Sequence, residues 1–192
     1  MATIVGICNE ALIRLGSPTI TDLTDSQPEA VKCNAIYADM RDNLLRCHPW
    51  NFALKRQKLA LETGRPAFGY ARRFALPSDF IRAVAVYDRD TSEGAPPAYR
   101  LEGLKILTDA GAVYLLYVSR IVDPNMMPPD FRHALSIHIA AELAGNLAES
   151  TVLREALQEE FRREALPMAR AADALEDAPR SIPESDWVTV RY

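Results

Sequence analysis

The chain has 192 residues, of which 48% are hydrophobic and 25% are charged, an ordinary balance for a globular protein. This composition excludes a disordered or low-complexity chain, and the length fits one domain or one domain with a modest insertion. The formal net charge of −4 argues against a broad basic face for binding nucleic acid.

The cysteines and the apolar runs indicate a cytoplasmic protein. Cys8, Cys33 and Cys47 are an odd number, and two of them occupy apolar positions of predicted helices, where buried free thiols are common. We therefore expect no disulfide framework and a reducing environment. The N-terminus lacks the basic start of a signal peptide, and no apolar run approaches the roughly 20 residues that span a bilayer.

Two helices are predicted before residue 50. Apolar residues recur at helical spacing from Ile4 to Leu15, with Thr3 as the N-cap and Gly16 as the stop. The run Ser26-Gln27-Pro28-Glu29 is a capping-box pattern with proline in the first turn, and it begins a second helix. Pro49 ends that helix, because the residue before a proline is pushed out of the α region.

Alternation replaces helical spacing between residues 51 and about 121. The segment 68–76 places aromatic residues on one face, and 81–87 is apolar on both faces, as in a central strand. Shorter runs at 99–107 and 113–121 predict the remaining strands. The connections are too short for crossovers, so we expect an antiparallel β meander of about five strands.

Helical spacing returns after residue 129. The helix that contains Phe131 and Leu147 is apolar on most sides, which predicts packing on most sides. Ser150 caps a last helix that reaches Leu175, and Pro167 should kink it.

The predicted fold class is therefore α+β, with helices first, strands inserted and helices last. We expect a four-helix bundle from residues 1–50 and 125–177, an inserted β section at 51–124, and an extended C-terminal arm at 178–192.

No residue pattern of catalysis, cofactor binding or metal binding stands out. Cys47-His48 has no second pair at zinc spacing, so a helix end with a buried thiol is the preferred interpretation. His138 and Glu142 share a helix face, as an acid–base or ligand pair does, but a structural histidine is favoured because the His-Glu-x-x-His pattern is absent. These two residues define the alternative of a small helical ligand-binding or enzymatic domain.

Two further runs are conspicuous. Lys55, Arg56, Lys58 and the pair Arg72-Arg73 can contact phosphate, but protection of strand edges is the preferred role. In His48-Pro49-Trp50-Asn51-Phe52 a helix terminator precedes two aromatic residues, and we predict that Trp50 is the wedge between the helical and β parts.

The last residues alternate between apolar and polar side chains, as a strand does. The predicted partner-binding residues of this arm are Trp187, Val188, Val190, Arg191 and Tyr192. Such an arm can add to a neighbour or partner by β-augmentation, and the alternative is that it folds back on its own domain. A bacterial regulatory module that binds a protein through this arm is a further alternative.

Short motifs are spread in order over nearly the whole chain. They are Ala11-Leu12-Ile13-Arg14-Leu15-Gly16, Tyr37, Arg41, Asp42, Leu45, His48-Pro49-Trp50-Asn51-Phe52-Ala53, Leu76-Pro77-Ser78-Asp79, Asp123-Pro124, Phe131, Ala134-Leu135, Glu142-Leu143-Ala144, Ala169-Arg170 and Asp173. In these motifs the sequence resembles the tail tubular protein A family, the head-to-tail adaptors of short-tailed bacteriophages. The Pro-Trp-Asn-Phe-Ala run is the strongest single match.

The resemblance implies a structural virion protein rather than an enzyme. Members of that family form a ring, thought to be twelve-fold, between the portal protein and the tail nozzle protein, and DNA passes through the lumen without specific recognition. The family brings no catalytic residues and no cofactor. The implied location is the neck of the virion after assembly in the host cytoplasm. Adaptors of long-tailed phages and of gene transfer agents share the helical plan and are the alternative.

Overall fold

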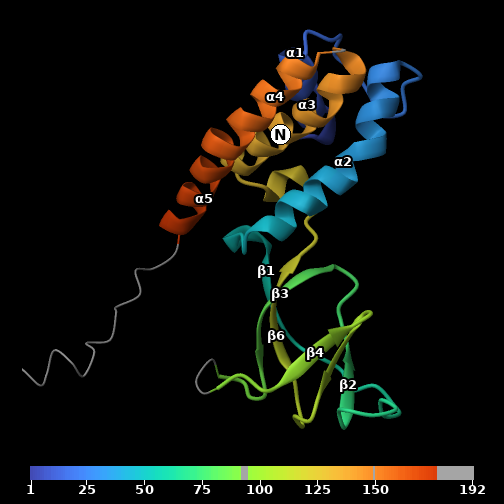
Figure 1. The fold of residues 1–192 in the computed structure, drawn as a ribbon, viewed down its shortest axis with the longest axis vertical. Coiled ribbons are helices and arrows are strands. Elements are labelled where there is room, and N and C mark those ends of the chain that lie inside the picture. The colour runs from blue at the N-terminus through green and yellow to red at the C-terminus, as the bar shows by residue number, and fades with distance from the viewer. Residues whose placement is uncertain (92–94, 149, 177–192) are drawn as a thin grey trace, which may run out of the picture.

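The computed structural model describes residues 1–91, 95–148 and 150–176. In these residues the helices pack into one body, and six antiparallel strands form two three-stranded sheets in a second body that projects from it (Figure 1). The predicted α+β class is confirmed. We call the two parts the helical body and the β body.

The helical body contains four helices within the described residues, the last of them interrupted by a π turn. They are α1 (Ile4–Arg14), α2 (Pro28–Cys47), α3 (Pro129–Leu147) and a long helix made of α4 (Thr151–Glu160), the π turn η3 (Phe161–Ala165) and α5 (Leu166–Leu175).

Most of the predicted helix ends are confirmed. The Thr3 hydroxyl accepts a hydrogen bond from the Gly6 N–H at 2.9 Å, and Ser150 caps α4 in the same way through Leu153. The predicted capping box at residues 26–29 is wrong. Pro28 is the first residue of α2, so the cap position falls on Gln27, whose side chain makes no capping hydrogen bond.

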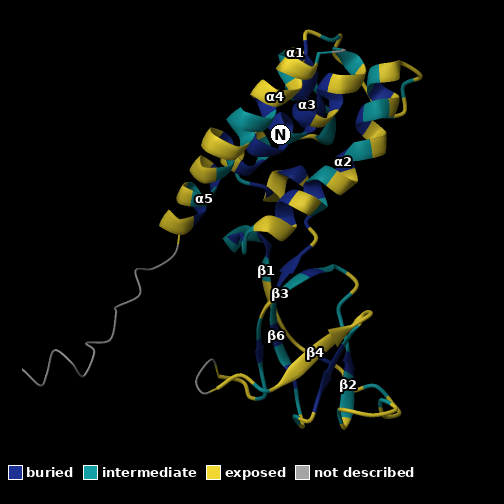
Figure 2. Ribbon diagram, viewed as in Figure 1, coloured by how far each residue is buried: buried dark blue, intermediate teal, exposed yellow. Residues whose placement is uncertain are grey.

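The helix α3 lies at the centre of the helical body, and Figure 2 shows it buried over most of its length. Alanines at positions such as Ala134 and Ala140 let the neighbouring helices approach it closely. The other helices all pack on α3, whereas α1 and α2 hardly contact each other. The helices therefore do not form a clear four-helix bundle, because one enclosed helix takes the place of a shared central core.

The strands are antiparallel as predicted, but the single meander of about five strands is wrong, because six strands form two separate sheets. One sheet has the order β1-β6-β3, and the other has the order β2-β5-β4. Their bounds are β1 Leu54–Lys58, β2 Arg72–Ala75, β3 Phe80–Tyr87, β4 Tyr99–Glu102, β5 Lys105–Thr108 and β6 Tyr114–Ser119. Only β4 and β5 are paired neighbours in sequence, and β6, the last strand, lies between the first and the third.

The chain changes sheets directly after β1, which is why no meander forms. The Leu59 N–H donates to the Val113 carbonyl at 2.8 Å beside the first sheet, and the Glu62 N–H donates to the Arg73 carbonyl at 3.0 Å beside the second. In the predicted strand 68–76 only Arg72–Ala75 pairs, and Phe68 is 89% exposed.

The predicted central strand is also displaced. Segment 80–87 forms β3 at an edge of its sheet, and β6 is central instead. The alternating side chains of β6 meet both hydrophobic cores. Val118 contributes to the core of the helical body, whereas Leu115 and Tyr117 pack with Phe74 and Ile106 between the two sheets.

At Pro167, where a kink is predicted, the structure has a π turn just before the proline. Its ring would clash with the carbonyl four residues earlier in a regular α-helix, and it donates no hydrogen bond. The π turn η3 precedes it and widens the helix there, with the Leu166 N–H donating to the Phe161 carbonyl. The helices α4 and α5 continue as one segment through this turn (Figure 1).

Candidate functional site

The first candidate site is the junction between the two bodies, which we call the joint and define as residues 48–53. Trp50 is only 1% exposed, and its indole N–H donates to the Leu44 carbonyl at 2.9 Å. Its ring meets the Phe131 ring edge-on with centroids 5.1 Å apart, and Phe52 lies against the same ring at 4.9 Å. Trp50 is buried at the junction as predicted, whereas its role as a wedge that fixes the angle between the two bodies stays a prediction.

Asp173 of α5 binds the joint from the other side. One carboxylate oxygen accepts a hydrogen bond from the Asn51 N–H at 2.8 Å, and the other lies 3.2 Å from His48 Nε2. The Asn51 side-chain amide donates to the Asp173 carbonyl at 2.8 Å. Since Asp173 is only 8% exposed, these contacts satisfy a carboxylate that would be costly to bury alone.

Ion pairs and hydrogen bonds of α2 hold the β body. Asp42 accepts from Arg41 Nε at 2.8 Å and from Arg120 Nε, just after β6, at 2.7 Å. Arg46 donates to the carbonyl of Ile81 in β3 at 2.7 Å. The bond between Arg41 and Asp42 lies within α2, whereas those to Arg120 and Ile81 join α2 to two different strand regions and so restrict rotation of the β body about this helix.

A third group of contacts lies at the corner before β3. The Asp79 carboxylate accepts from Lys55 Nζ at 2.6 Å and from the Tyr117 hydroxyl at 3.0 Å. Burial works to raise the pKa of Asp79, but these two hydrogen bonds, a backbone hydrogen bond and the charge of Lys55 together lower it. Burial, together with the bond to Asp79, raises the pKa of Tyr117 to about 12.

No hydrogen bond or ion pair joins His138 to Glu142 among the described residues, and the ligand-binding or enzymatic alternative stays a prediction. The His138 ring stacks on Phe161 with centroids 4.6 Å apart, and burial lowers its pKa although the Glu142 charge acts in the opposite direction. Glu142 itself is exposed. His133 binds Glu10 instead, at 2.8 Å, on another face of α3.

The cysteines divide into two environments. Cys8 and Cys33 are buried free thiols, as predicted, and a hydrogen bond between them raises the pKa of Cys8. The buried thiol predicted at Cys47 is wrong, because the last turn of α2 leaves it exposed. No three His, Cys, Asp or Glu side chains gather as metal ligands in the part of the chain that the structure describes.

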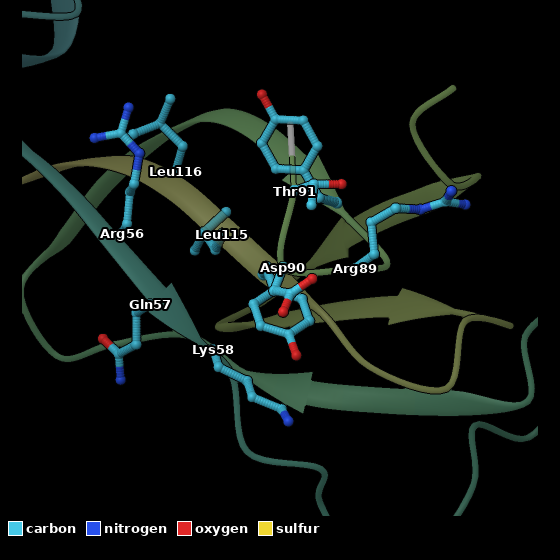
Figure 3. A pocket seen from close by; sticks show the side chains of 10 residues that line it. Arg56, Gln57, Lys58, Arg89, Asp90, Thr91, Leu115 and Leu116 are labelled. Carbon is cyan, nitrogen blue, oxygen red and sulfur yellow. The ribbon is translucent and has the colours of Figure 1, made fainter. Parts of the chain in front are cut away.

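The second candidate site is a hollow of about 460 Å³ on the β body, which we call the basic hollow. Its lining includes the cations Arg56, Lys58 and Arg89 and the tyrosines Tyr87 and Tyr114. Figure 3 shows the three cations on different sides of the hollow.

In the sequence, Arg56 and Lys58 form one basic group with Lys55, and this grouping did not predict the hollow. Side chains of a strand alternate between its two faces, so Lys55 points toward Asp79 whereas Arg56 and Lys58 line the hollow. The sequence signal for the hollow is that Arg56 and Lys58 are two residues apart, which places both cations on one face of a strand. Arg72 and Arg73 lie in the other sheet, where Arg73 pairs with Glu62.

The predicted partner-binding residues Trp187, Val188, Val190, Arg191 and Tyr192 lie outside the described residues. Among the described residues, no helix combines the length and apolar character that crossing a bilayer requires. A comparison of the chain with protein-family models and with curated proteins gives no match.

Proposed function

We propose that the chain is a structural virion protein, one subunit of the adaptor ring that joins the portal of a bacteriophage head to its tail nozzle. The proposal starts from the resemblance to the tail tubular protein A family. The joint supports the proposal further, because residues of the motifs that carry the resemblance make the main contacts at the joint.

Three aspartates of those motifs each bind a different part of the molecule. Asp42 binds Arg120 after β6, Asp79 binds Lys55 of β1, and Asp173 binds Asn51 of the joint. Trp50, from the strongest motif, is buried at the joint against Phe131 of α3. The Asp42 contact joins the helical body to the β body and the Asp173 contact holds the joint, whereas the Asp79 contact stiffens the β body itself. A subunit that connects two rings at a set spacing needs such a fixed arrangement.

In the proposed assembly the helical body contacts the portal and the neighbouring subunits, and the β body faces outward or toward the nozzle. The arm at 178–192 extends to the portal, and Trp187, Val188, Val190, Arg191 and Tyr192 supply its contacts. Aromatic anchors are the side chains that contribute most at such interfaces. Twelve copies close the ring, and DNA passes through its lumen without sequence-specific recognition.

Electron microscopy of the full chain mixed with purified portal rings tests the proposal. We expect an additional ring of density on the tail-facing end of the portal. The matched control is the chain with Trp50→Ala, in which the loosened joint should reduce ring closure. Portal rings that stay bare at saturating concentrations of the unaltered chain, with the chain absent from purified particles, would overturn the proposal.

A further inference from the structure

The basic hollow contains a row of side chains that crosses all three strands of the sheet β1-β6-β3. Lys58 is paired in register with Tyr114, and Tyr114 is paired in register with Tyr87. Side chains of directly paired residues stand on the same face of a sheet. The row therefore presents one ammonium group and two phenol rings side by side on the outer face, away from the core between the two sheets.

Cations surround this row. Lys58 Nζ lies 5.3 Å from the centroid of the Tyr114 ring, Arg56 stands two residues earlier on the same strand, and Arg89 follows the end of β3. Arg89 is paired with Asp88, and Asp90 also lines the hollow. Arg56 and Lys58 make no ion pair with any residue in the described parts of the chain. The hollow thus carries local positive charge in a chain of net charge −4.

We propose that the basic hollow binds a single strand of nucleic acid without sequence preference. Its phosphates would be held by Arg56, Lys58 and Arg89, and an unstacked base would lie on the row formed by Tyr87 and Tyr114. Cations that follow a backbone beside aromatic rings that accept bases are the two elements of such sites.

The aromatic row distinguishes this ligand from two others. Bases inside a duplex are stacked on each other, so a duplex offers only its phosphates to the hollow. An acidic peptide would pair with the cations but would leave the two rings without a planar partner. The net negative charge of the chain does not oppose the proposal. At physiological salt, charges farther than about 8 Å from the ligand are largely screened, so the cations of the hollow decide the local attraction.

This inference does not depend on ring assembly, so its test uses the full chain alone in solution. The probe is a fluorescently labelled oligodeoxythymidylate of about 15 nucleotides, within the range that single-strand sites cover. Fluorescence anisotropy should show binding that weakens with salt, and each phosphate contact contributes about −0.7 to the slope of log K against log salt concentration. A duplex of the same length should bind more weakly.

Three variants locate the site. The double variant Arg56→Ala/Lys58→Ala should reduce the magnitude of the salt slope by about 1.4, corresponding to two contacts. Tyr114→Leu should weaken binding roughly tenfold, whereas Tyr114→Phe, which keeps the ring, should retain it. The matched control is Arg100→Ala on β4 of the other sheet, an exposed strand cation whose removal should change little.

Two results would overturn the inference. Equal binding of the single strand, the duplex and an oligoglutamate peptide would identify a general polyanion surface, and the rings would have no part in it. An equal effect of Arg100→Ala and the double variant would show that binding follows total charge and not the hollow.

Discussion

The carboxylate of Asp173 accepts a hydrogen bond from the backbone N–H of Asn51 at 2.8 Å, although the two residues are 122 positions apart in sequence. This contact attaches the end of the last helix to the joint between the two bodies. We expect Asp173→Ala to lower the free energy of unfolding by about 1–3 kcal/mol, because it leaves a partly buried N–H donor without its acceptor. Urea denaturation measures the change.

The control for this variant is Asp130→Ala, which removes an exposed carboxylate near the start of α3. It should change the stability by less than about 0.5 kcal/mol. Equal urea midpoints for the two variants would show that the bond between Asp173 and Asn51 contributes nothing to stability.

Truncation of Trp50 should be the most damaging single change at the joint. Its ring is buried against Phe131, and Trp50→Ala leaves a cavity and removes the indole hydrogen bond to the Leu44 carbonyl, which keeps only the bond from the Cys47 thiol. Removal of a large buried aromatic side chain costs about 3–5 kcal/mol. Trp50→Phe should cost distinctly less because it keeps a ring in the site. A Trp50→Ala protein that unfolds at the same urea concentration as the unaltered chain contradicts the wedge role.

Tyr37 should make the protein sensitive to alkali. Its hydroxyl is buried without a hydrogen-bond partner among the described residues, and burial raises its pKa to about 12 although Arg41 acts in the opposite direction. The unfolded phenol ionises near pH 10, so the stability linked to this group is present below pH 10 and is lost as the pH rises toward 12. Tyr37→Phe removes this loss and costs little at neutral pH.

The measurement is the urea midpoint at several pH values from 8 to about 11.5, a window set by the ordinary and raised pKa values. Tyr117→Phe serves as the comparison, because its pKa is raised similarly but its hydroxyl donates to Asp79. That variant should lose stability at neutral pH, whereas Tyr37→Phe should not. A large neutral-pH loss in Tyr37→Phe would contradict the assignment of an unpaired hydroxyl.

Asp79 should make the protein less stable at acid pH, whereas Tyr37 makes it less stable at alkaline pH. Its pKa is lowered from the ordinary value of 3.8, so its stabilising effect is present above about pH 4 and is lost as the pH falls through the lowered pKa. Asp79→Asn should therefore be less stable at neutral pH and should lose less on acidification. Parallel acid titrations of the variant and the unaltered chain, followed by circular dichroism, compare the two slopes, and identical slopes would contradict the prediction.

Deletion of residues 178–192 tests the proposed role of the arm. The described helices and strands end before this segment, so the shortened chain should unfold at an unchanged urea concentration. Docking on the portal should be lost, as measured by co-sedimentation with portal rings. Normal docking by the shortened chain would exclude the arm as the portal contact.

Local sequence patterns determined the helices and the main strand segments. Thr3, Ser150 and Pro49 act within a few residues of themselves, so the ends they produce can be predicted from neighbouring positions. The burial of Trp50 was also predictable, because a large apolar ring directly after a helix terminator has to be buried where the next element begins.

Only the tertiary structure decided the strand order, the enclosed position of α3 and the basic hollow. The insertion of β6 between β1 and β3 depends on which distant segments pair, and the alternation within one strand carries no information about its partner. The row of Lys58, Tyr114 and Tyr87 exists because three strands from distant parts of the chain align in register. The sequence by itself specified the local elements, whereas contacts between residues far apart in the chain determined what those elements place side by side.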